Sequence, residues 1–476
     1  MSKPDLRKLR DAISGRVLVE KTDMAAFLTD WRGKWTGNAI AVVQPNSAEE
    51  VATVVGWCVD QELAVVPQGG NTGLSGGATP DESGRNIVLS LTRLNKVREI
   101  DPVNNTLTVE AGASLHNVQE AARTAGRLFP LSLAAEGSCT IGGNLATNAG
   151  GVQVLRYGNA RDLCLGLEVV TPQGKIWSGL RGLRKDNTGY DLRDLYIGSE
   201  GTLGIITAAV LKLYPQPASR TVSWASVQNA QAATDLLQLA RQELGAGLSA
   251  FELISGACVD LVAAQRPDVS RPLAQDAPWQ VLLEFSDSEG EGHAETLLEG
   301  FWSLAFEQGL ATDAVQASSL SQAAALWSWR EDISESQAAA GPTIKHDISL
   351  PISRIADFIE VTGAELGTNF PQVRLVVFGH LGDGNLHYNL SPQPGASAQA
   401  LADFIALEPA LNQLVHDQVV AHEGSISAEH GLGQLRRDES ARYKSAVELE
   451  LMQTIRQALD PLGLMNPGKL LASTHN

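Results

Sequence analysis

Three glycine-dense segments within about 140 residues constrain the fold of this chain more than any other feature. They are PQGGNTGLSGG at 67–77, EGSCTIGGNLATNAGG at 136–151 and GSEGTLG at 198–204. Glycine lets backbone N–H groups approach an anion with no Cβ in the way, and consecutive N–H groups form a cationic nest. A single such loop is better explained as a tight turn, but three together favour a large phosphorylated cofactor. No GxxxxGK[ST] motif occurs, and none of the three loops contains GxGxxG.

Short apolar runs alternate with these loops and predict β-strands. We expect strands at 40–43, 63–66, 87–91, 97–100, 106–111, 165–171 and 175–177. Ser47-Ala-Glu-Glu50 is a capping box that opens a helix, Asn104-Asn105 is a hairpin turn, and 115–125 is an amphipathic helix.

From about Thr221 the composition becomes rich in alanine and leucine, with separated strands. Strands expected at 223–227, 280–285 and 345–348 alternate with helices near 229–244, 289–308 and 352–366, and the tail from about Pro409 is mostly helical. This pattern predicts an α+β fold with an antiparallel sheet in the second half. The predicted boundaries are a helical lead-in at 1–35, a cofactor domain at 36–217, a second domain at 218–408 and a helical segment at 409–476.

Composition limits the class of protein and its partners. The 476 residues are too many for one hydrophobic core, and 43% hydrophobic with 19% charged residues is typical of a globular protein. The 54 acidic and 36 basic residues leave a net charge of −18, which argues against nucleic acid or an anionic membrane as partner.

The cysteines and the apolar runs bear on the compartment. Cys58, Cys139, Cys164 and Cys258 form no CxxC pair, which argues against a disulfide framework or an in-chain iron–sulfur cluster. The N-terminal residues lack the apolar core of a secretory signal, and no run of about 18 apolar residues occurs. We therefore expect a soluble cytosolic protein with no membrane span.

The stretch 374–390, RLVVFGHLGDGNLHYNL, is typical of a β-hairpin. Asp383-Gly384 between two apolar runs predicts a two-residue type I′ turn, which needs φ > 0 at both positions. That register places His380 directly opposite His387, with Cβ atoms about 5 Å apart, so that both imidazoles could bind one metal ion. A three-residue loop would break this pairing.

Glu429 in the downstream run SAEHG offers a third metal ligand, and the neighbouring His430 offers a proton acceptor. A His₂Glu set leaves one coordination position open, as in catalytic zinc sites, although manganese, iron and cobalt also accept these ligands. The alternatives are a buried hydrogen-bonded histidine pair and an exposed glutamate. Two facing histidines with a Glu-His elsewhere favour the metal.

The three glycine segments, in this order and with the third extended to GSEGTLGIIT, resemble the FAD-binding domain of the vanillyl-alcohol-oxidase superfamily. With GHLGDGNLH, SAEHG and NPGK added, the chain resembles the FAD-linked D-2-hydroxyacid dehydrogenases of the D-2-hydroxyglutarate and D-lactate branch. The resemblance covers nearly all of residues 38–470. It implies a two-part FAD-binding domain at 36–217, a substrate and metal domain at 218–408, and a C-terminal segment that returns to the flavin.

The resemblance also implies the residues around the cofactor. Relatives with covalent flavin often carry a histidine in the first loop, and this loop has none, so we expect FAD to be bound non-covalently. The implied FAD contacts are Pro67, Gly69, Gly70, Asn71, Thr72, Gly73, Ser75, Gly76, Glu136, Gly137, Thr140, Gly143, Asn148, Gly150, Gly151, Gly201, Ile206 and Asn466.

His380, His387 and Glu429 match the metal positions of the family, and Arg330, Ser334 and Lys345 match residues that bind the substrate carboxylate. Ser334 stands where threonine is usual, which should alter fit more than charge. From the residues alone, Arg330 would be a helix-surface arginine paired with a neighbouring acid, and Lys345 an ordinary strand lysine. Asn389 would hydrogen-bond the substrate, and His430 would be the catalytic base.

The resemblance implies oxidation of a D-2-hydroxyacid, with hydride transfer to flavin N5 and electrons passed to electron-transfer flavoprotein or a quinone-linked carrier. Three anchors beyond the metal suit D-2-hydroxyglutarate, a dicarboxylate, better than D-lactate. D-lactate or broad D-2-hydroxyacid oxidation is the alternative within the class. The alternatives from other functional classes are a flavin-free metallohydrolase and a non-catalytic subunit of a larger oxidase. A homodimer is a reasonable prior.

Overall fold

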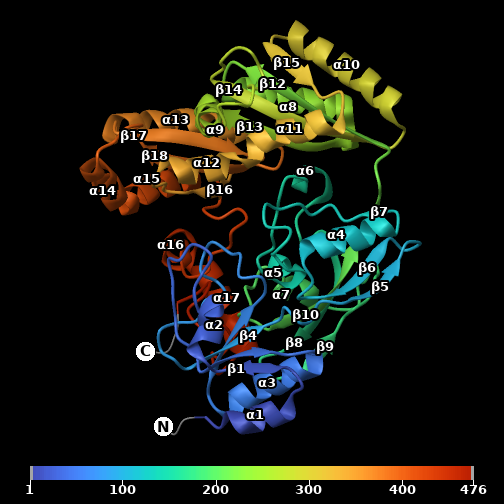
Figure 1. Ribbon diagram of the computed structural model, residues 1–476, viewed down its shortest axis with the longest axis vertical. Coiled ribbons are helices and arrows are strands. Elements are labelled where there is room, and N and C mark those ends of the chain that lie inside the picture. The colour runs from blue at the N-terminus through green and yellow to red at the C-terminus, as the bar shows by residue number, and fades with distance from the viewer. Residues whose placement is uncertain (1–3, 473–476) are drawn as a thin grey trace. The chain divides into compact units, whose positions relative to one another are not determined.

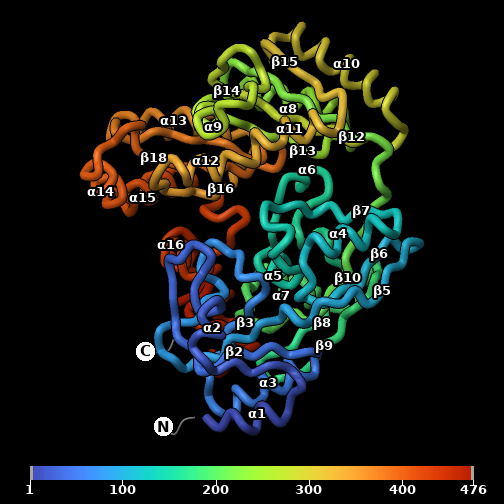
Figure 2. The backbone as a smooth tube through the Cα atoms, in the orientation of Figure 1, coloured from blue at the N-terminus to red at the C-terminus, as the bar shows by residue number. Residues whose placement is uncertain are grey.

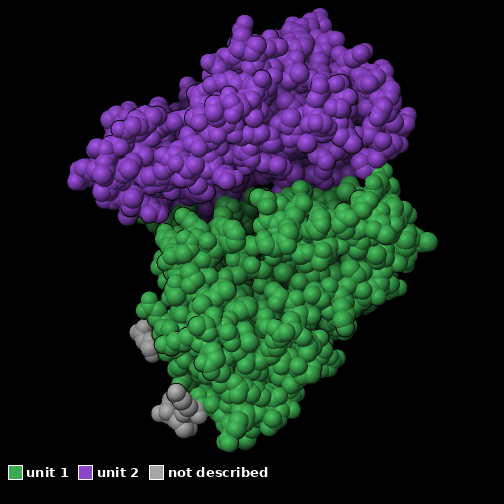
Figure 3. All heavy atoms as spheres, in the orientation of Figure 1, with its two compact units in different colours: residues 1–150, 158–216, 429–476 green, residues 151–157, 217–428 purple. Residues whose placement is uncertain are grey.

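The computed structural model describes residues 4–472, which form two compact units (Figures 1 and 2). Unit 1 comprises residues 1–150, 158–216 and 429–476, and unit 2 comprises residues 151–157 and 217–428 (Figure 3). The predicted C-terminal segment is therefore divided, because residues 409–428 belong to unit 2 and the residues after them to unit 1.

Unit 1 contains a four-stranded sheet with the order β1-β2-β4-β3. Its strands are β1 (Arg16–Leu18), β2 (Ala41–Gln44), β3 (Ala64–Gln68) and β4 (Asn86–Ser90). The pairs β2–β4 and β3–β4 are parallel, and their largely buried apolar runs are typical of parallel strands. Strand β1, within the predicted helical lead-in, pairs with β2 instead, so the lead-in is not wholly helical.

The second sheet of unit 1 is antiparallel, with the order β5-β6-β10-β8-β9. Its strands are β5 (Val97–Asp101), β6 (Thr106–Glu110), β8 (Cys164–Val170), β9 (Ile176–Ser178) and β10 (Ile205–Lys212). A separate pair joins β7 (Arg127–Leu128) to β11 (Tyr214–Pro215). The β5–β6 hairpin is confirmed, and Asn105 at its turn has φ +53°.

The helices of unit 1 include two from the C-terminal end of the chain. They are α1 (Leu6–Ala12), α2 (Lys21–Leu28), α3 (Ala48–Asp60), α4 (Leu115–Thr124), α5 (Ile141–Ala146), α7 (Leu192–Tyr196), α16 (Arg437–Tyr443) and α17 (Ala446–Leu459). The chain then rejoins the first sheet, where Met465 bridges to Val65 and the Asn466 N–H donates to the Val65 carbonyl.

The capping box predicted at the start of α3 forms only in part. The Ser47 hydroxyl accepts the Glu50 N–H at 3.3 Å, as expected for a helix N-cap. The Glu50 carboxylate, however, accepts the N–H groups of Ser14 and Asn46 at 2.7 and 2.8 Å instead of that of Ser47. It therefore ties the segment before β1 to the helix.

Unit 2 is built on a seven-stranded antiparallel sheet with the order β15-β12-β14-β13-β17-β18-β16, which confirms the predicted α+β class. The strands are β12 (Ser219–Val227), β13 (Leu248–Ser255), β14 (Trp279–Asp287), β15 (Asp313–Gln316), β16 (Asp347–Ser349), β17 (Val373–Gly379) and β18 (Asn385–Pro392). The helices are α6 (Val154–Tyr157), α8 (Ala230–Leu244), α9 (Gly256–Gln265), α10 (Glu291–Glu307), α11 (Leu320–Glu331), α12 (Ile333–Ala340), α13 (Ile355–Asn369), α14 (Ala398–Ala406) and α15 (Glu408–Ala421), with short 3₁₀ turns at Gly245–Gly247 and Ile352–Arg354.

One face of this sheet forms a hydrophobic core with helices α9 and α11. Strand residues Trp224, Ile254 and Phe378 belong to this core, as do Trp327 and Trp329 of α11. Because directly opposed residues of paired strands share a face, side chains from β13, β17, β18 and β16 are placed in one row. No helix within residues 4–472 has the length and apolar character needed to cross a membrane.

Candidate active site

A large pocket in unit 1 is lined by the three glycine segments. Its empty space, including space open to solvent, is about 950 Å³. The sequence-predicted cofactor residues that line it are Pro67, Gly69, Gly70, Asn71, Thr72, Gly73, Ser75, Thr140, Gly143, Gly201 and Ile206. The structure thus brings together parts of the chain that are well over 100 residues apart.

Several predicted cofactor residues do not line this pocket: Gly76, Glu136, Gly137, Asn148, Gly150, Gly151 and Asn466. Glu136 and Asn148, among others, have local partners. The Glu136 carboxylate accepts hydrogen bonds from Gln119 and Ser132, and the Asn148 side-chain oxygen accepts the Arg161 N–H. Their place at a cofactor stays a prediction.

The glycines of the first segment serve two purposes. A Cβ on Gly69 would lie 2.2 Å from Thr140 Oγ1, and one on Gly70 would lie 1.9 Å from the Ser138 carbonyl, so both allow the first two segments to touch. A Cβ on Gly73 would meet no protein atom within 4 Å. The chain thus leaves room at Gly73 for a ligand to approach the backbone closely.

Glu200, a pocket residue that sequence reasoning missed, holds the SAEHG region against the third glycine segment. Its two carboxylate oxygens accept the N–H groups of Leu432 and Gly433 at 2.8 and 2.9 Å. Burial raises its pKa to about 7, although these N–H groups and the nearby Lys469 favour the charged form. Its backbone has φ +50°, an unusual value for a glutamate.

Asn466 connects the first and third glycine segments through hydrogen bonds. Its side-chain NH₂ donates to the Gly77 carbonyl at 2.9 Å and to the Glu200 carbonyl at 2.7 Å. Its Oδ1 is buried and finds no hydrogen-bond donor among the described residues. This oxygen therefore remains able to accept a hydrogen bond.

His430 lines the same pocket. The Ser75 hydroxyl donates to the carbonyls of His430 and Gly431 at 3.2 and 3.1 Å, so the first glycine segment holds the backbone of the predicted base. Gly431 has φ +69°, and a Cβ there would lie 2.7 Å from Glu200 Oε1. The glycine directly after the histidine thus lets this turn close on Glu200.

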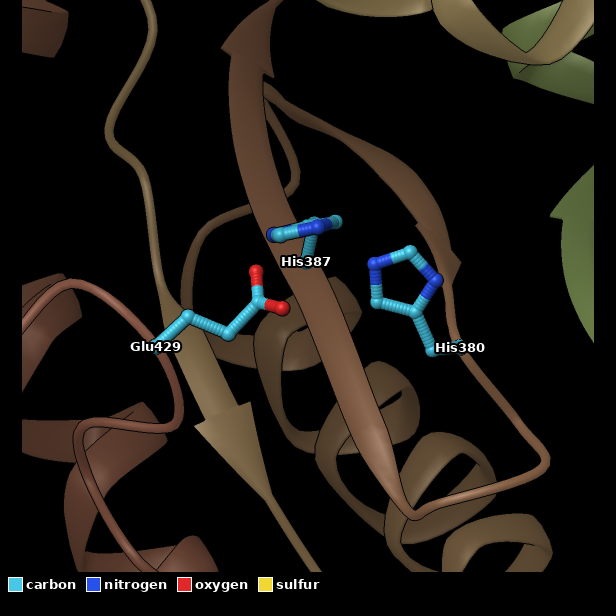
Figure 4. A group of neighbouring side chains, drawn as sticks. All are labelled: His380, His387 and Glu429. Atoms are coloured by element: carbon cyan, nitrogen blue, oxygen red, sulfur yellow. The ribbon is translucent and has the colours of Figure 1, made fainter. Parts of the chain in front are cut away.

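In unit 2, His380 and His387 converge with Glu429, the residue that directly follows unit 2 in the chain. Their potential ligand atoms all lie within 4.8 Å of one another. Figure 4 shows the Glu429 carboxylate and one ring nitrogen of His380 both directed toward His387. The place of Glu429 follows from its neighbour, because the Ala428 N–H donates to the carbonyl of Asp347 on β16.

The predicted type I′ turn at Asp383-Gly384 is wrong. The register pairs Phe378 with His387, so strands β17 and β18 are joined by a five-residue loop, 380–384. Only Gly384 has a positive φ, +90°, and the Asp383 carboxylate accepts the Asn385 N–H at 3.0 Å, which favours the wider turn. A Cβ on Gly384 would lie 2.3 Å from the Leu350 carbonyl, so this glycine also serves close packing.

The two histidines nevertheless converge, with ring centroids 5.9 Å apart and planes at 76°. His380 lies two residues beyond Phe378, on the side of the hairpin that carries His387, so the rings meet as diagonal neighbours and not as a facing pair. The observed register differs from the predicted one by two residues. Because side chains of a strand alternate between faces with a period of two, the two histidines still lie on the same face.

Glu252 on β13 is a second residue that sequence reasoning missed. It is fully buried, its Oε1 lies 2.7 Å from Nδ1 of His380, and its Oε2 accepts Nε–H of Arg330 at 2.7 Å. Burial alone would raise its pKa, but the positive charges of His380 and Arg330 and their hydrogen bonds lower it to about 2. A single charge in the apolar run LSAFELIS is the signal that could have identified it.

The predicted substrate residues lie on separate elements of unit 2. Arg330, on α11, is buried and stacks over the Phe378 ring at 4.7 Å, and it pairs with Glu252 instead of the neighbouring Glu331 or Asp332. Ser334 is exposed on α12, which begins after α11 has ended, and Lys345 is half-buried before β16.

Asn389 on β18 is buried, and protein groups already use both ends of its amide. It accepts the His346 N–H at 3.2 Å and donates to Gln337 at 3.0 Å. His346 also places Nδ1 2.9 Å from the Tyr388 carbonyl.

Comparisons with known proteins cover the whole chain. Residues 39–179 match the FAD binding domain model and residues 216–470 match the model for the C-terminal domain of FAD linked oxidases. The D-2-hydroxyglutarate dehydrogenase of Xanthomonas citri pathovar viticola is 40% identical over 100% of this chain and 98% of that protein. The mitochondrial D-2-hydroxyglutarate dehydrogenase of Bos taurus is 38% identical over 99% of this chain and 84% of that protein.

Among solved structures, p-cresol methylhydroxylase with substrate bound has a TM-score of 0.74 at 16% identity and covers 99% of this chain and 97% of its own. At that identity the likeness concerns the fold alone. Since one of these relatives is mitochondrial, the expected cytosolic location stays a prediction.

Proposed function

Because the chain belongs to the FAD-linked oxidase family and is an FAD-dependent D-2-hydroxyacid dehydrogenase, we propose that its substrate is D-2-hydroxyglutarate and that a divalent metal assists the reaction. The product is 2-oxoglutarate. The observation that carries the choice of substrate is the buried guanidinium of Arg330, which contacts Glu252, the partner of His380, and Phe378, the ring neighbour of His387.

Arg330 suits a second carboxylate because of what holds it. Its Nε–H is bonded to Glu252 and its plane lies over Phe378, whose ring is 4.8 Å from that of His387. Within residues 4–472 its Nη groups have no hydrogen-bond acceptor, so both remain available to a carboxylate. D-lactate has no second carboxylate to offer, whereas D-2-hydroxyglutarate has one.

The cofactor fit is supported by the pocket of unit 1. The open space at Gly73 suits a pyrophosphate against backbone N–H groups. The metal fit is supported by the donor set of two imidazoles and one carboxylate, which leaves a position for substrate. Zinc is the proposed metal, and manganese, iron or cobalt would accept the same ligands.

When bound, these groups supply a hydride acceptor and a Lewis acid that lowers the pKa of the substrate hydroxyl. The chain supplies the rest. Arg330 and Lys345 bind the distal carboxylate, and an imidazole nitrogen of His430 takes the hydroxyl proton as the C2–H bond breaks. Ser75 holds the His430 carbonyl, and Glu200 holds the backbone N–H groups of Leu432 and Gly433 just after it.

The electrons must then leave for a separate carrier, for which we propose electron-transfer flavoprotein or a quinone-linked protein. The four cysteines are all buried and lie far apart in the sequence, so they do not suggest an iron–sulfur cluster in this chain. We propose a homodimer only as the commonest oligomer.

The test is anaerobic reduction of the bound flavin by a panel of D- and L-2-hydroxyacids. The loss of yellow colour measures the reduction. We expect D-2-hydroxyglutarate to reduce the flavin with the highest specificity constant, and its L-enantiomer to leave the flavin oxidised. Equal or faster reduction by D-lactate would support the broader D-2-hydroxyacid activity instead. A protein that is colourless as purified would contradict the proposal altogether.

A further inference from the structure

Glu252 is a buried carboxylate to which the proposed reaction assigns no step. It lies on β13, in the middle of the seven-stranded sheet, between the apolar residues Phe251 and Leu253. Its side chain is fully buried, and each of its oxygens is used by a different partner. A buried carboxylate is costly unless it is paired and hydrogen-bonded, so its two partners are what make it tolerable here.

The antiparallel register explains how these partners reach it. Leu253 on β13 pairs with Gly379 on β17, so the next position along places Glu252 opposite His380. Arg330 approaches the same face from α11, with its guanidinium over Phe378. The two partners are therefore 50 residues apart in the sequence but share one carboxylate.

A purely structural role explains this arrangement poorly. Replacing a buried ion pair by apolar residues of similar volume is often neutral or stabilising, so the fold alone gives little reason to keep charges at this place. The partners themselves point to the reason, because one is a proposed metal ligand and the other a proposed substrate anchor.

We propose that Glu252 is a positioning residue that holds the metal-binding imidazole of His380 with one oxygen and the substrate-binding guanidinium of Arg330 with the other. This inference rests on the proposed function. Glu252 would then fix the spacing between the metal, which binds the hydroxyacid end of the substrate, and Arg330, which binds the distal carboxylate. A fixed spacing of this kind favours a dicarboxylate substrate.

At His380 the carboxylate selects the tautomer. A hydrogen bond from Nδ1–H to Glu252 leaves Nε2 without a proton, and Nε2 is then the nitrogen available to a metal. Figure 4 shows a ring nitrogen of His380 directed toward His387, as this requires. Carboxylate partners of metal-binding histidines typically contribute 10- to 100-fold to metal affinity.

At Arg330 the carboxylate fixes the direction of the fork. The bond to Nε–H and the contact with the Phe378 ring together hold both the plane and the rotation of the guanidinium. The Nη pair then faces its ligand without the loss of side-chain entropy that a free arginine would suffer on binding.

The experiment compares three variants with the wild-type holoenzyme. Glu252→Gln offers one acceptor oxygen, so it can serve only one of the two N–H donors. Arg330→Lys removes the planar fork but leaves His380 untouched. Glu284→Gln is the matched control, since Glu284 on β14 is also fully buried and bonded to an arginine, Arg220, but does not contact His380 or Arg330.

Two quantities are measured for each protein: the Kd for Zn²⁺, by competition with a chelator, and the KM for D-2-hydroxyglutarate and for D-lactate. We expect Glu252→Gln to bind Zn²⁺ 10- to 100-fold more weakly and to show a KM for D-2-hydroxyglutarate raised roughly tenfold more than that for D-lactate. Arg330→Lys should change only the KM for the dicarboxylate, and Glu284→Gln neither quantity.

Wild-type values for both quantities in Glu252→Gln, with the wild type itself binding Zn²⁺ and oxidising D-2-hydroxyglutarate, would overturn the inference and leave the proposed function standing. If the wild type binds no metal, both the inference about Glu252 and the proposed metal-assisted function are wrong. Should Glu252→Gln not fold, a crystal structure of the wild type with Zn²⁺ decides: coordination through Nε2 of His380 supports the inference, and coordination through Nδ1 overturns it.

Discussion

His430 shows how one side chain connects the two halves of the proposed chemistry. It lines the pocket formed by the glycine segments, and it is the direct neighbour of Glu429, which converges with His380 and His387. Chain adjacency alone therefore keeps the base within one residue of a proposed metal ligand. A base must lie within reach of the proton that it takes, and the adjacency of His430 to Glu429 places it near a substrate bound to the metal.

The His430→Ala variant tests that role. We expect it to retain FAD and metal but to slow anaerobic flavin reduction by D-2-hydroxyglutarate by about 100-fold or more, because general base catalysis typically contributes that much. Stopped-flow absorbance at saturating substrate measures it. The control is His116→Ala, an exposed histidine on α4, and reduction of His430→Ala at the control's rate would remove it as the base.

At the scale of elements, the third glycine segment and the residues after SAEHG form one unit through Glu200. Two backbone N–H groups donate to this carboxylate, and Lys469 lies near enough to favour its charge, but burial dominates and raises its pKa to about 7. Burial likewise lowers the pKa of Lys469 to about 8. The loop that carries the base is thus held by a group that titrates near neutral pH.

This gives a pH dependence with a definite sign. The Glu200 carboxyl keeps its proton up to about pH 7 in the folded chain but only to about 4.5 in the unfolded chain. The unfolded state therefore ionises first, and the Glu200 contribution to the free energy of unfolding falls as pH rises from 4.5 to 7. The shift from 4.5 to about 7 corresponds to roughly 3 kcal/mol at about 1.4 kcal/mol per pH unit.

Urea unfolding of the wild type and of Glu200→Gln at pH 5 and pH 7.5, with equal FAD, measures this contribution. Glutamine cannot ionise, so the stability of the wild type relative to the variant should be lower at pH 7.5 than at pH 5. The same difference at both pH values would contradict the raised pKa.

At the scale of the whole molecule, the acidic chain must accept an anionic substrate. A net charge of −18 repels such a ligand at long range, so binding depends on local cations such as Arg330 and Lys345. We therefore do not expect substrate binding to become tighter at low ionic strength, as it would for a basic protein.

The attachment of FAD is also a property of the whole chain. The pocket holds no histidine from the first glycine segment, and the expectation from sequence is a dissociable cofactor. Acid precipitation or heating should release the yellow colour to the supernatant, measured by absorbance near 450 nm. Colour that stays with the precipitated protein after washing would indicate a covalent bond.

The sequence by itself determined the elements whose signals are local. Apolar runs located β2, β3, β4, β5, β6, β8 and β9, but not β10 or β1, which lies in the predicted helical lead-in. The Asn104-Asn105 turn and helix α4 were also located, because strand period, turn chemistry and helix caps act over a few residues. The glycine segments, taken together, indicated a cofactor domain before any contact was known. The His-x₆-His spacing indicated one metal-binding face even though the turn between the histidines was wrong.

Tertiary structure alone decided what depends on distant pairing. That β13 lies beside β17, which places Glu252 against His380, and that Glu200 meets Leu432 and Gly433, cannot be read from runs of residues. Even the 380–384 loop follows this rule, since the Gly382 N–H donates to the Phe251 carbonyl and Gly384 packs on Leu350, neither of them near in sequence. Local propensities fix which segments are strands, but the energy that selects their partners comes from burial and hydrogen bonds between segments far apart in the chain.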